Sequence, residues 1–261
     1  MKHNLSGRST AFRFDCYACS QAGPESTNNE DAAAVDPDNG VFVVADGMGG
    51  RPEGALASRV AAKAFLDTIL GFRGKQRLRT SALEKAIRAA NVSVLRCSRL
   101  SPMRNGMGTT LSAAVVAGNA GRVVHVGDTR IYLYHAGRLE QITRDHTLAQ
   151  ELAGRQRLSE DCASAHPLGH VLSRTVGTRA YVVPDIQEFA LLPGDGLILT
   201  SDGVSRVLRR EELRRIARKR WRSGARPVCE ALLQHARAKQ PADDLTIIVT
   251  KLVSENGSAL C

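Results

Sequence analysis

The 261-residue sequence contains no apolar run long enough to cross a membrane, and its first residues, MKHNLSGRSTAFRF, lack the apolar stretch of a signal peptide. It also lacks an internal repeat and a linker rich in Pro, Ser or Gly. These absences argue against a membrane protein and favour one domain over residues 1–261. We expect this domain to be cytoplasmic and monomeric.

Paired cysteines of the kind that bind zinc are also scarce. Cys16 and Cys19 form one C-x-x-C pair in a strand-like segment, and no second pair lies at zinc-finger spacing. The six cysteines fit a reducing compartment, and the sequence does not support a structural zinc site.

The net charge of +10 is unevenly distributed. Residues 206–226, RVLRREELRRIARKRWRSGAR, carry ten Arg or Lys against two Glu, with Trp221 as the only aromatic residue. Such a stretch can bind nucleic acid or an acidic or phosphorylated protein, but it can also be the solvated face of a helix. We favour the helix face over nucleic-acid binding.

Hydrophobic periodicity predicts more strands than helices. Helices are predicted at Pro52–Leu70, around Leu83–Val94, and after Pro227. Strands are predicted at Phe12–Cys19, Val41–Ala45, Thr109–Ala117, Arg122–Val126, Arg130–Tyr134, Ile186–Leu191, Leu197–Thr200 and Leu245–Thr250. Because strands and helices do not alternate strictly, this order favours antiparallel sheets with helices packed outside them.

The segment VFVVADGMGG, residues 41–50, ends an apolar strand with Asp46 and a glycine-rich turn. Such turns can bind phosphate, but a dinucleotide fingerprint needs a third glycine where Pro52 stands. A P-loop needs Lys and then Ser or Thr where Ala55 and Leu56 stand. An Asp-Gly pair is common in ordinary turns, but a carboxylate held beside bare backbone also suits a hard cation.

Acidic residues recur in this context, at the end of an apolar strand or in the turn beside it. They are Glu30–Asp31, Asp46, Asp128, Asp202 and Asp243–Asp244. Strand ends at one edge of a sheet system would gather these charges, which then require a cation or raised pKa values. An all-oxygen set predicts Mg²⁺ or Mn²⁺.

With these motifs in order, the chain resembles the metal-dependent PP2C-type (PPM) protein serine/threonine phosphatases of bacteria. The resemblance covers nearly the whole chain and rests on NNED, VVADGMGG, GMGTTLSAAVV, VVHVGDTRIYLY, QITRDHT, HPLGHVLSRTVG, LLPGDGLILTSDGVS and ADDLTIIV. It implies an α+β fold, a four-layer α-β-β-α sandwich of two antiparallel sheets flanked by helices. It also implies a mobile flap at about residues 146–166.

Carried over to this sequence, the resemblance makes Asp46 the carboxylate that bridges two Mn²⁺ or Mg²⁺ ions, with the Gly47 carbonyl on one of them. Asp202 and Asp243 would complete the shell of the first ion. These three aspartates are the predicted catalytic residues.

The remaining carboxylates have more peripheral predicted roles. Glu30 and Asp31 would hold the second ion or orient its waters, and Asp128 with Asp202 would bind a third ion, as in bacterial members. Paired divalent ions lower the pKa of a water, which can then attack phosphorus in line without a covalent phosphoenzyme.

Three positions depart from the family pattern. Ser26 stands where many members carry an Arg that binds the substrate phosphate, and Arg51 is a candidate replacement. Met48 stands where some members have a general-acid His, and Arg206 stands where an acidic residue is common. Arg206 could weaken metal binding or contact phosphate, and the sequence does not decide between them.

Two functional hypotheses follow, with a nucleic-acid-binding protein as a weaker third. The first is an active phosphatase for phosphoserine and phosphothreonine in proteins, opposing a cognate bacterial Ser/Thr kinase. The second is a catalytically impaired module that binds phosphoproteins, suggested by Ser26 and Arg206. Retention of the three catalytic aspartates favours the active enzyme.

Overall fold

The computed structural model describes residues 12–24, 28–48, 52–104, 106–156 and 167–254. Its strands form two sheets in which every pair is antiparallel. The first sheet has the order β1 (Phe12–Gln21), β11 (Leu245–Ser254), β10 (Gly196–Thr200), β7 (Arg130–His135) and β8 (Arg138–Gln141). The second has the order β2 (Asp31–Asp36), β3 (Val41–Met48), β5 (Leu111–Ala117), β6 (Ala120–Val126) and β9 (Asp185–Ala190), with β4 (Gly108–Thr109) paired to the end of β3.

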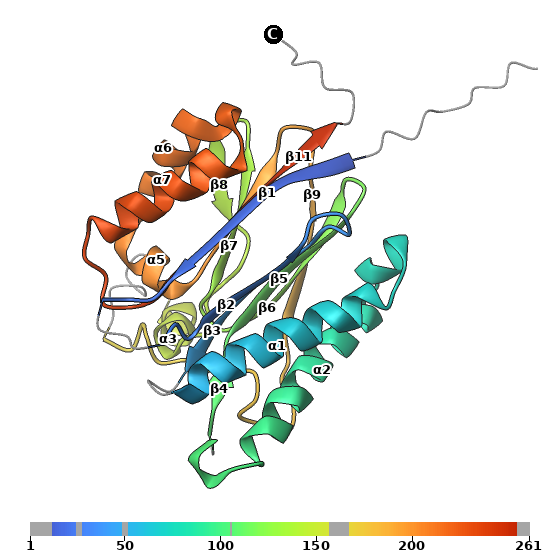
Figure 1. Cartoon of the computed structure of the whole chain (residues 1–261), viewed down its shortest axis with the longest axis vertical. Helices are drawn as coiled ribbons and strands as arrows, with labels where there is room; N and C mark the ends of the chain where they lie inside the picture. Colours follow the sequence, from blue (N-terminus) through green and yellow to red (C-terminus); the bar gives the residue numbers. More distant parts are fainter. Residues whose placement is uncertain (1–11, 25–27, 49–51, 105, 157–166, 255–261) are drawn as a thin grey trace, which may run out of the picture.

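Helices cover the outer face of each sheet (Figure 1). One outer layer consists of α1 (Pro52–Leu70) and α2 (Thr80–Ser98), and the other of α5 (Asp202–Val207), α6 (Arg210–Arg220) and α7 (Ala225–Arg237). A further helix, α3 (Leu148–Gln156), lies near one end of the sheets. The predicted α+β four-layer sandwich is therefore confirmed.

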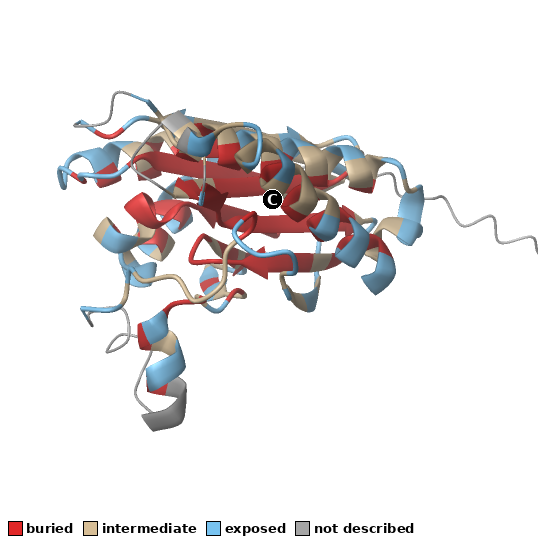
Figure 2. Ribbon diagram, turned by 90° about the horizontal axis from the view of Figure 1, so that it is seen from below, coloured by how far each residue is buried: buried red, intermediate tan, exposed pale blue. Residues whose placement is uncertain are grey.

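Alternation along the strands builds three layers of apolar contact. Val41, Val43 and Ala45 of β3 face α1 and α2, whereas Phe42 and Val44 face the other sheet. Buried residues thus line both faces of the strands, and exposed residues lie on the outer faces of the helices (Figure 2).

Most predicted elements are confirmed, with shifted bounds. Helix α1 has the predicted bounds, but α7 begins at Ala225, two residues before Pro227. The predicted strand Thr109–Ala117 is interrupted at Thr110 and forms two strands. The sequence prediction missed the short strands β2 and β8. Of the predicted flap, residues 148–156 form α3 and residues 157–166 lie outside the described residues.

The basic stretch forms α6, a short 3-10 turn and the beginning of α7. Trp221 is 7% exposed, stacks on Tyr134 at 4.0 Å between ring centroids, and donates a hydrogen bond to the Gly194 carbonyl. The Trp221 ring is therefore packed in the core and is not available to stack on nucleic-acid bases. Within the described residues, no helix is both long and apolar enough to span a bilayer.

Candidate metal centre

Five aspartates lie at one end of the two sheets, as the strand pattern predicts. Asp31 begins β2 directly opposite Asp46 of β3, and Asp202 follows β10 as the first residue of α5. Asp128 lies in the turn between β6 and β7, and Asp243 lies just before β11. We call Asp31, Asp46, Asp128, Asp202 and Asp243 the carboxylate cluster.

Backbone hydrogen bonds hold Asp46 in place at the interruption between β4 and β5. The Asp46 amide donates to Thr110 Oγ1 at 2.9 Å, and the Asp46 carbonyl accepts from Thr109 Oγ1 at 2.8 Å and from the Thr110 amide at 2.9 Å. Because these bonds use main-chain groups of Asp46, its carboxylate remains available to a ligand. Thr109 and Thr110 thus position the backbone of Asp46.

Burial and mutual repulsion raise the pKa of the four buried members of the cluster, Asp31, Asp46, Asp128 and Asp202. Burial is the larger cause for Asp46, whose pKa lies well above its ordinary value, and the charges of the other members raise it further. Burial likewise raises the pKa of Asp31 to about 7 and that of Asp128 to about 8, with Asp202 adding repulsion in both cases. These four carboxylates therefore cannot all ionise near neutral pH without additional positive charge.

Two buried oxygens of the cluster lack hydrogen-bond partners, Asp31 Oδ2 and Asp202 Oδ1. Buried polar atoms are rarely left unpaired, so these oxygens mark a place for a ligand. Among the described residues, no three acidic, His or Cys side chains converge closely enough to enclose an ion as they stand. The oxygen-only donor set fits Mn²⁺ or Mg²⁺ after side-chain adjustment.

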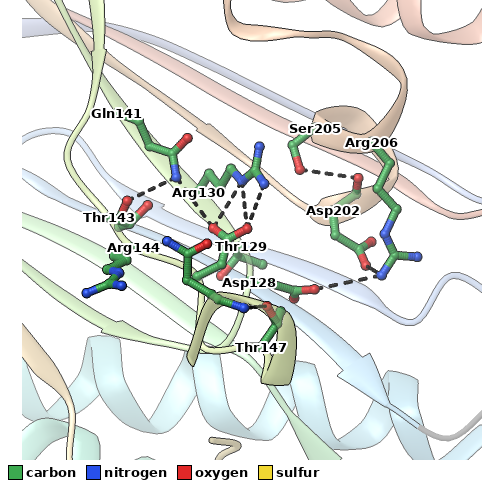
Figure 3. A network of polar contacts seen from close by, with 12 residues as sticks. Asp128, Thr129, Arg130, Gln141, Thr143, Arg144, Thr147, Asp202, Ser205 and Arg206 are labelled. Carbon is green, nitrogen blue, oxygen red and sulfur yellow. Dashed lines mark hydrogen bonds and ion pairs between the residues drawn. The ribbon is translucent and has the colours of Figure 1, made fainter. Parts of the chain in front are cut away.

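Arg206 contacts three members of the cluster, and Figure 3 shows its contacts with Asp128 and Asp202. Its Nη2 pairs with Asp202 Oδ2 and lies 3.7 Å from Asp128 Oδ2, while Nη1 lies 3.6 Å from Asp243 Oδ2. The guanidinium lowers the pKa of both Asp128 and Asp202, against the larger effect of burial. The sequence singled out Arg206 as a departure but did not predict this three-way contact.

Glu30 and Gly47 lie where the end of β3 meets the start of α1. The Gly47 amide donates to the Glu30 carbonyl at 3.0 Å. A Cβ on Gly47 would overlap the Gly54 carbonyl, and a Cβ on Gly54 would overlap the Glu30 carboxylate. Glycine at both positions therefore allows the Glu30 side chain to lie against the first turn of α1.

Asp244 is a supporting residue to which the sequence assigned no role. It is 4% exposed and accepts hydrogen bonds from the Gly23 amide at 2.7 Å and the Glu30 amide at 2.6 Å. It thereby holds the chain that enters β2, where Glu30 and Asp31 lie. A double acidic sequence before a strand was the available signal, but it could not show which of the two carboxylates faces inward.

Polar contacts of neighbouring residues hold the turn that carries Asp128. Arg130, beside Asp128 in the chain, pairs with Asp145 through Nη2–Oδ2 at 2.6 Å and Nε–Oδ1 at 3.0 Å. His146 donates its amide to the Gly127 carbonyl at 2.7 Å and accepts the Gly127 amide at Nδ1 at 3.2 Å. Because burial also lowers its pKa, His146 fits a structural role better than that of a proton donor.

Two predicted positions lie outside the described residues, Ser26 and the candidate phosphate contact Arg51. Met48, another of the three departures from the family pattern, is half-buried and lies opposite Gly108 in the β3–β4 pair. It brings no titratable group to the cluster, so any acid for a leaving group must come from elsewhere.

A sequence model described as protein phosphatase 2C matches residues 24–249. The chain belongs to the protein phosphatase 2C family. The family resemblance predicted from the motifs is thus confirmed.

Two relatives illustrate how far this similarity extends. The serine/threonine protein phosphatase PstP of Mycobacterium tuberculosis is 37% identical over 190 residues, which cover 72% of this chain and 36% of PstP. The chain thus matches little more than a third of that relative's length. The serine/threonine phosphatase stp of Listeria monocytogenes is 30% identical over 232 residues, which cover 86% of this chain and 90% of that protein.

Solved structures of the family have the same fold. The catalytic domain of PstP in complex with two manganese ions superposes with a TM-score of 0.82 at 29% identity, covering 94% of this chain and all of that chain. The catalytic domain of this relative thus binds two manganese ions, the type of ion that the family resemblance predicts. In this phosphatase 2C chain, the carboxylate cluster is the oxygen donor set that such ions would require.

Proposed function

We propose that this phosphatase 2C protein is a metal-dependent serine/threonine protein phosphatase that acts as a single domain. The observation that carries the proposal is the carboxylate cluster, in which two buried oxygens lack partners and burial and mutual repulsion raise the pKa values of Asp31 and Asp128. Donors of this type bind hard divalent cations, and the family's metal-bound structure supports the same assignment.

Asp46, Asp202 and Asp243 would hold the first ion, Asp46 would also serve the second, and the Gly47 carbonyl would hold one of the two. Glu30 and Asp31 would hold the second ion or its waters. When bound, such ions supply a water of lowered pKa and offset the negative charge of the phosphoryl group.

The protein itself holds this donor set in place and keeps bulk water away from its buried carboxylates. Thr109 and Thr110 fix the backbone of Asp46, and Asp244 fixes the chain before Asp31. Arg51 remains a proposed phosphate contact. The cysteines have no part, since none is followed by the C-x₅-R spacing of a phosphocysteine loop.

A binding module with little or no turnover is the second candidate. It is favoured by Arg206, which pairs with Asp202 and Asp243, two of the three predicted catalytic residues. If those pairs persisted with phosphoprotein bound, the first ion would lose part of its shell.

Hydrolysis of p-nitrophenyl phosphate and a phosphothreonine peptide, with Mn²⁺, with Mg²⁺ and with EDTA, separates these candidates. We expect metal-dependent turnover that Asp46→Asn reduces by more than about 100-fold, since even residues that only support ligands contribute about 10–100-fold. Asn keeps the main-chain bonds of Asp46, so the variant should fold. Phosphopeptide binding without turnover would favour the binding module, and turnover in EDTA would reject the metal mechanism.

The partners follow from the proposed reaction. A protein that removes phosphate from Ser and Thr requires phosphoprotein substrates and a kinase that produces them, so we propose a cognate Ser/Thr kinase. We further propose that the protein works as a cytoplasmic monomer that needs neither a membrane nor nucleic acid. Exposed basic residues of α6 suit an acidic or phosphorylated partner.

A further inference from the structure

Arg206 divides the carboxylate cluster into two unequal parts. Its guanidinium contacts Asp128, Asp202 and Asp243 within 4 Å. Asp128 and Asp202 have side chains only 7% and 11% exposed, so this positive charge faces two largely desolvated carboxylates. Because water screens these buried carboxylates poorly, their attraction to the guanidinium is stronger than that between two surface charges.

The other part of the cluster lies between β2 and β3. Asp31 and Asp46 face each other there as a cross-strand pair of like charge, an arrangement that is unfavourable without a cation. The two buried oxygens of the cluster without hydrogen-bond partners are Asp31 Oδ2 and Asp202 Oδ1. Arg206 pairs with the other carboxylate oxygen of Asp202, Oδ2. Asp31, Asp46 and one oxygen of Asp202 therefore remain available as ligands, and so does Asp243, whose half-exposed side chain lies 3.6 Å from Arg206.

A divalent ion between Asp128 and Asp202 would lie beside the Arg206 guanidinium, which already contacts both carboxylates. The two positive charges would repel each other at this short range. Arg206 therefore disfavours a metal ion at this position.

From this geometry we infer that the Arg206 guanidinium takes the place of a third divalent cation between Asp128 and Asp202, so that the protein has a two-ion centre. The inference rests on the proposed function, since it assumes that the remaining carboxylates hold two ions. Unlike a metal ion, a guanidinium cannot be removed by chelators, is always charged, and presents its donors in a fixed fork.

The backbone around Arg206 places its side chain beside the carboxylate cluster. Arg206 lies four residues after Asp202 on α5, so the pair forms within one helical turn. A Cβ on Gly203 would overlap the Asp244 carbonyl, so α5 starts in close contact with the chain that leads into β11. The guanidinium thus lies between the strand ends, although 46% of the Arg206 side chain is exposed.

Counting bound Mn²⁺ tests the inference without measuring activity. The full chain is dialysed to equilibrium against a range of Mn²⁺ concentrations, and bound metal per chain is measured by mass spectrometry. We expect two ions in the native protein and three in Arg206→Ala, where Asp128 and Asp202 become available. Arg206→Gln repeats the test with a longer neutral side chain, and circular dichroism checks that both variants fold.

Three control variants make the count specific. Arg206→Lys keeps the charge and should bind two ions. Arg206→Ala combined with Asp128→Asn should return from three ions to two. Arg215→Ala removes one charge from the exposed surface of α6 and should leave the count at two.

Other outcomes would overturn the inference. Three ions in the native protein, or two in Arg206→Ala, would show that Arg206 does not replace an ion. Tighter binding of the same two ions in Arg206→Ala would mean that Arg206 competes with the ions at Asp202 and Asp243. These results would leave the proposed phosphatase intact, whereas no bound Mn²⁺ in the native protein would overturn both.

Discussion

Asp243 and Asp244 are adjacent in the chain but lie in different surroundings. Asp243 is exposed and faces Arg206, whereas Asp244 is buried and accepts two main-chain hydrogen bonds. The first is therefore a candidate ligand, and the second stabilises the chain around it. The motif ADDLTIIV identified the pair, but only the packing of Gly23 and Glu30 against one carboxylate separates their roles.

Replacing Asp244 should mainly lower stability, whereas replacing Asp243 should mainly weaken metal binding. Asp244→Ala leaves the amides of Gly23 and Glu30 without acceptors and should lower the free energy of unfolding by about 2–4 kcal/mol, measured in urea without metal. Asp243→Asn is the matched change at an exposed position and should alter it by about 0.5 kcal/mol or less while weakening Mn²⁺ binding. Equal destabilisation by the two changes would contradict the assigned roles.

At the scale of elements, the contact between β3 and α1 sets the position of Glu30. Gly47 and Gly54 approach so closely that neither can carry a Cβ without movement of its neighbours. The atom that a Gly54 Cβ would meet first is the end of the flexible Glu30 side chain, whereas a Gly47 Cβ would meet backbone. Gly54 is therefore the position at which Glu30 can be moved with little strain on the backbone.

Gly54→Ala should separate metal binding from stability. Ala favours a helix over Gly by about 1 kcal/mol, so α1 should not be weakened, but the Glu30 carboxylate must leave its place. We expect Mn²⁺ affinity to fall by about 10-fold, measured by calorimetry alongside thermal melting. Gly71→Ala, just after α1, provides the control because its Cβ would meet only the Thr68 carbonyl at 3.3 Å. Unchanged Mn²⁺ affinity in Gly54→Ala would exclude Glu30 from the metal centre.

The elements that sequence reasoning missed depend on tertiary contacts. Strand β2 has the sequence DAAAVD, in which alanine gives little local preference for a strand. It forms because β3 pairs with it, and this pairing puts Asp31 opposite Asp46. Helix α1 and the long strands carry their own periodicity and could be predicted.

For the molecule as a whole, sequence motifs identified the carboxylates of the candidate site and singled out Arg206, but not the contacts of Arg206 with three of those carboxylates. Each aspartate follows or precedes an apolar strand, which is a local signal. Arg206 reaches Asp128 and Asp243 only because two sheets bring distant strand ends together. Long-range contacts of this kind leave no periodic pattern in the sequence.

The same packing makes the metal-free protein sensitive to pH. Asp31, with a pKa of about 7, and Asp128, with a pKa of about 8, retain protons that the unfolded chain releases near pH 4. Their contribution to stability is complete below that pH and is lost as pH rises through the folded values. Buried His125, with its pKa lowered to about 3, and His146, with its pKa lowered by burial, act in the opposite direction below about pH 6.5.

Above about pH 6.5 the histidines are neutral in the folded protein and at most half protonated in the unfolded chain, so their opposing effect is smaller than that of the two aspartates. We expect the metal-free protein to lose about 1–2 kcal/mol between pH 6.5 and 8, or roughly 2–8 °C in melting temperature. Saturating Mn²⁺ should abolish the loss because it binds the ionised carboxylates, and Asp128→Asn should reduce it without metal. A melting temperature of the metal-free protein that stays constant or rises over this range would mean that the cluster is already ionised, with Arg206 and water compensating its charge.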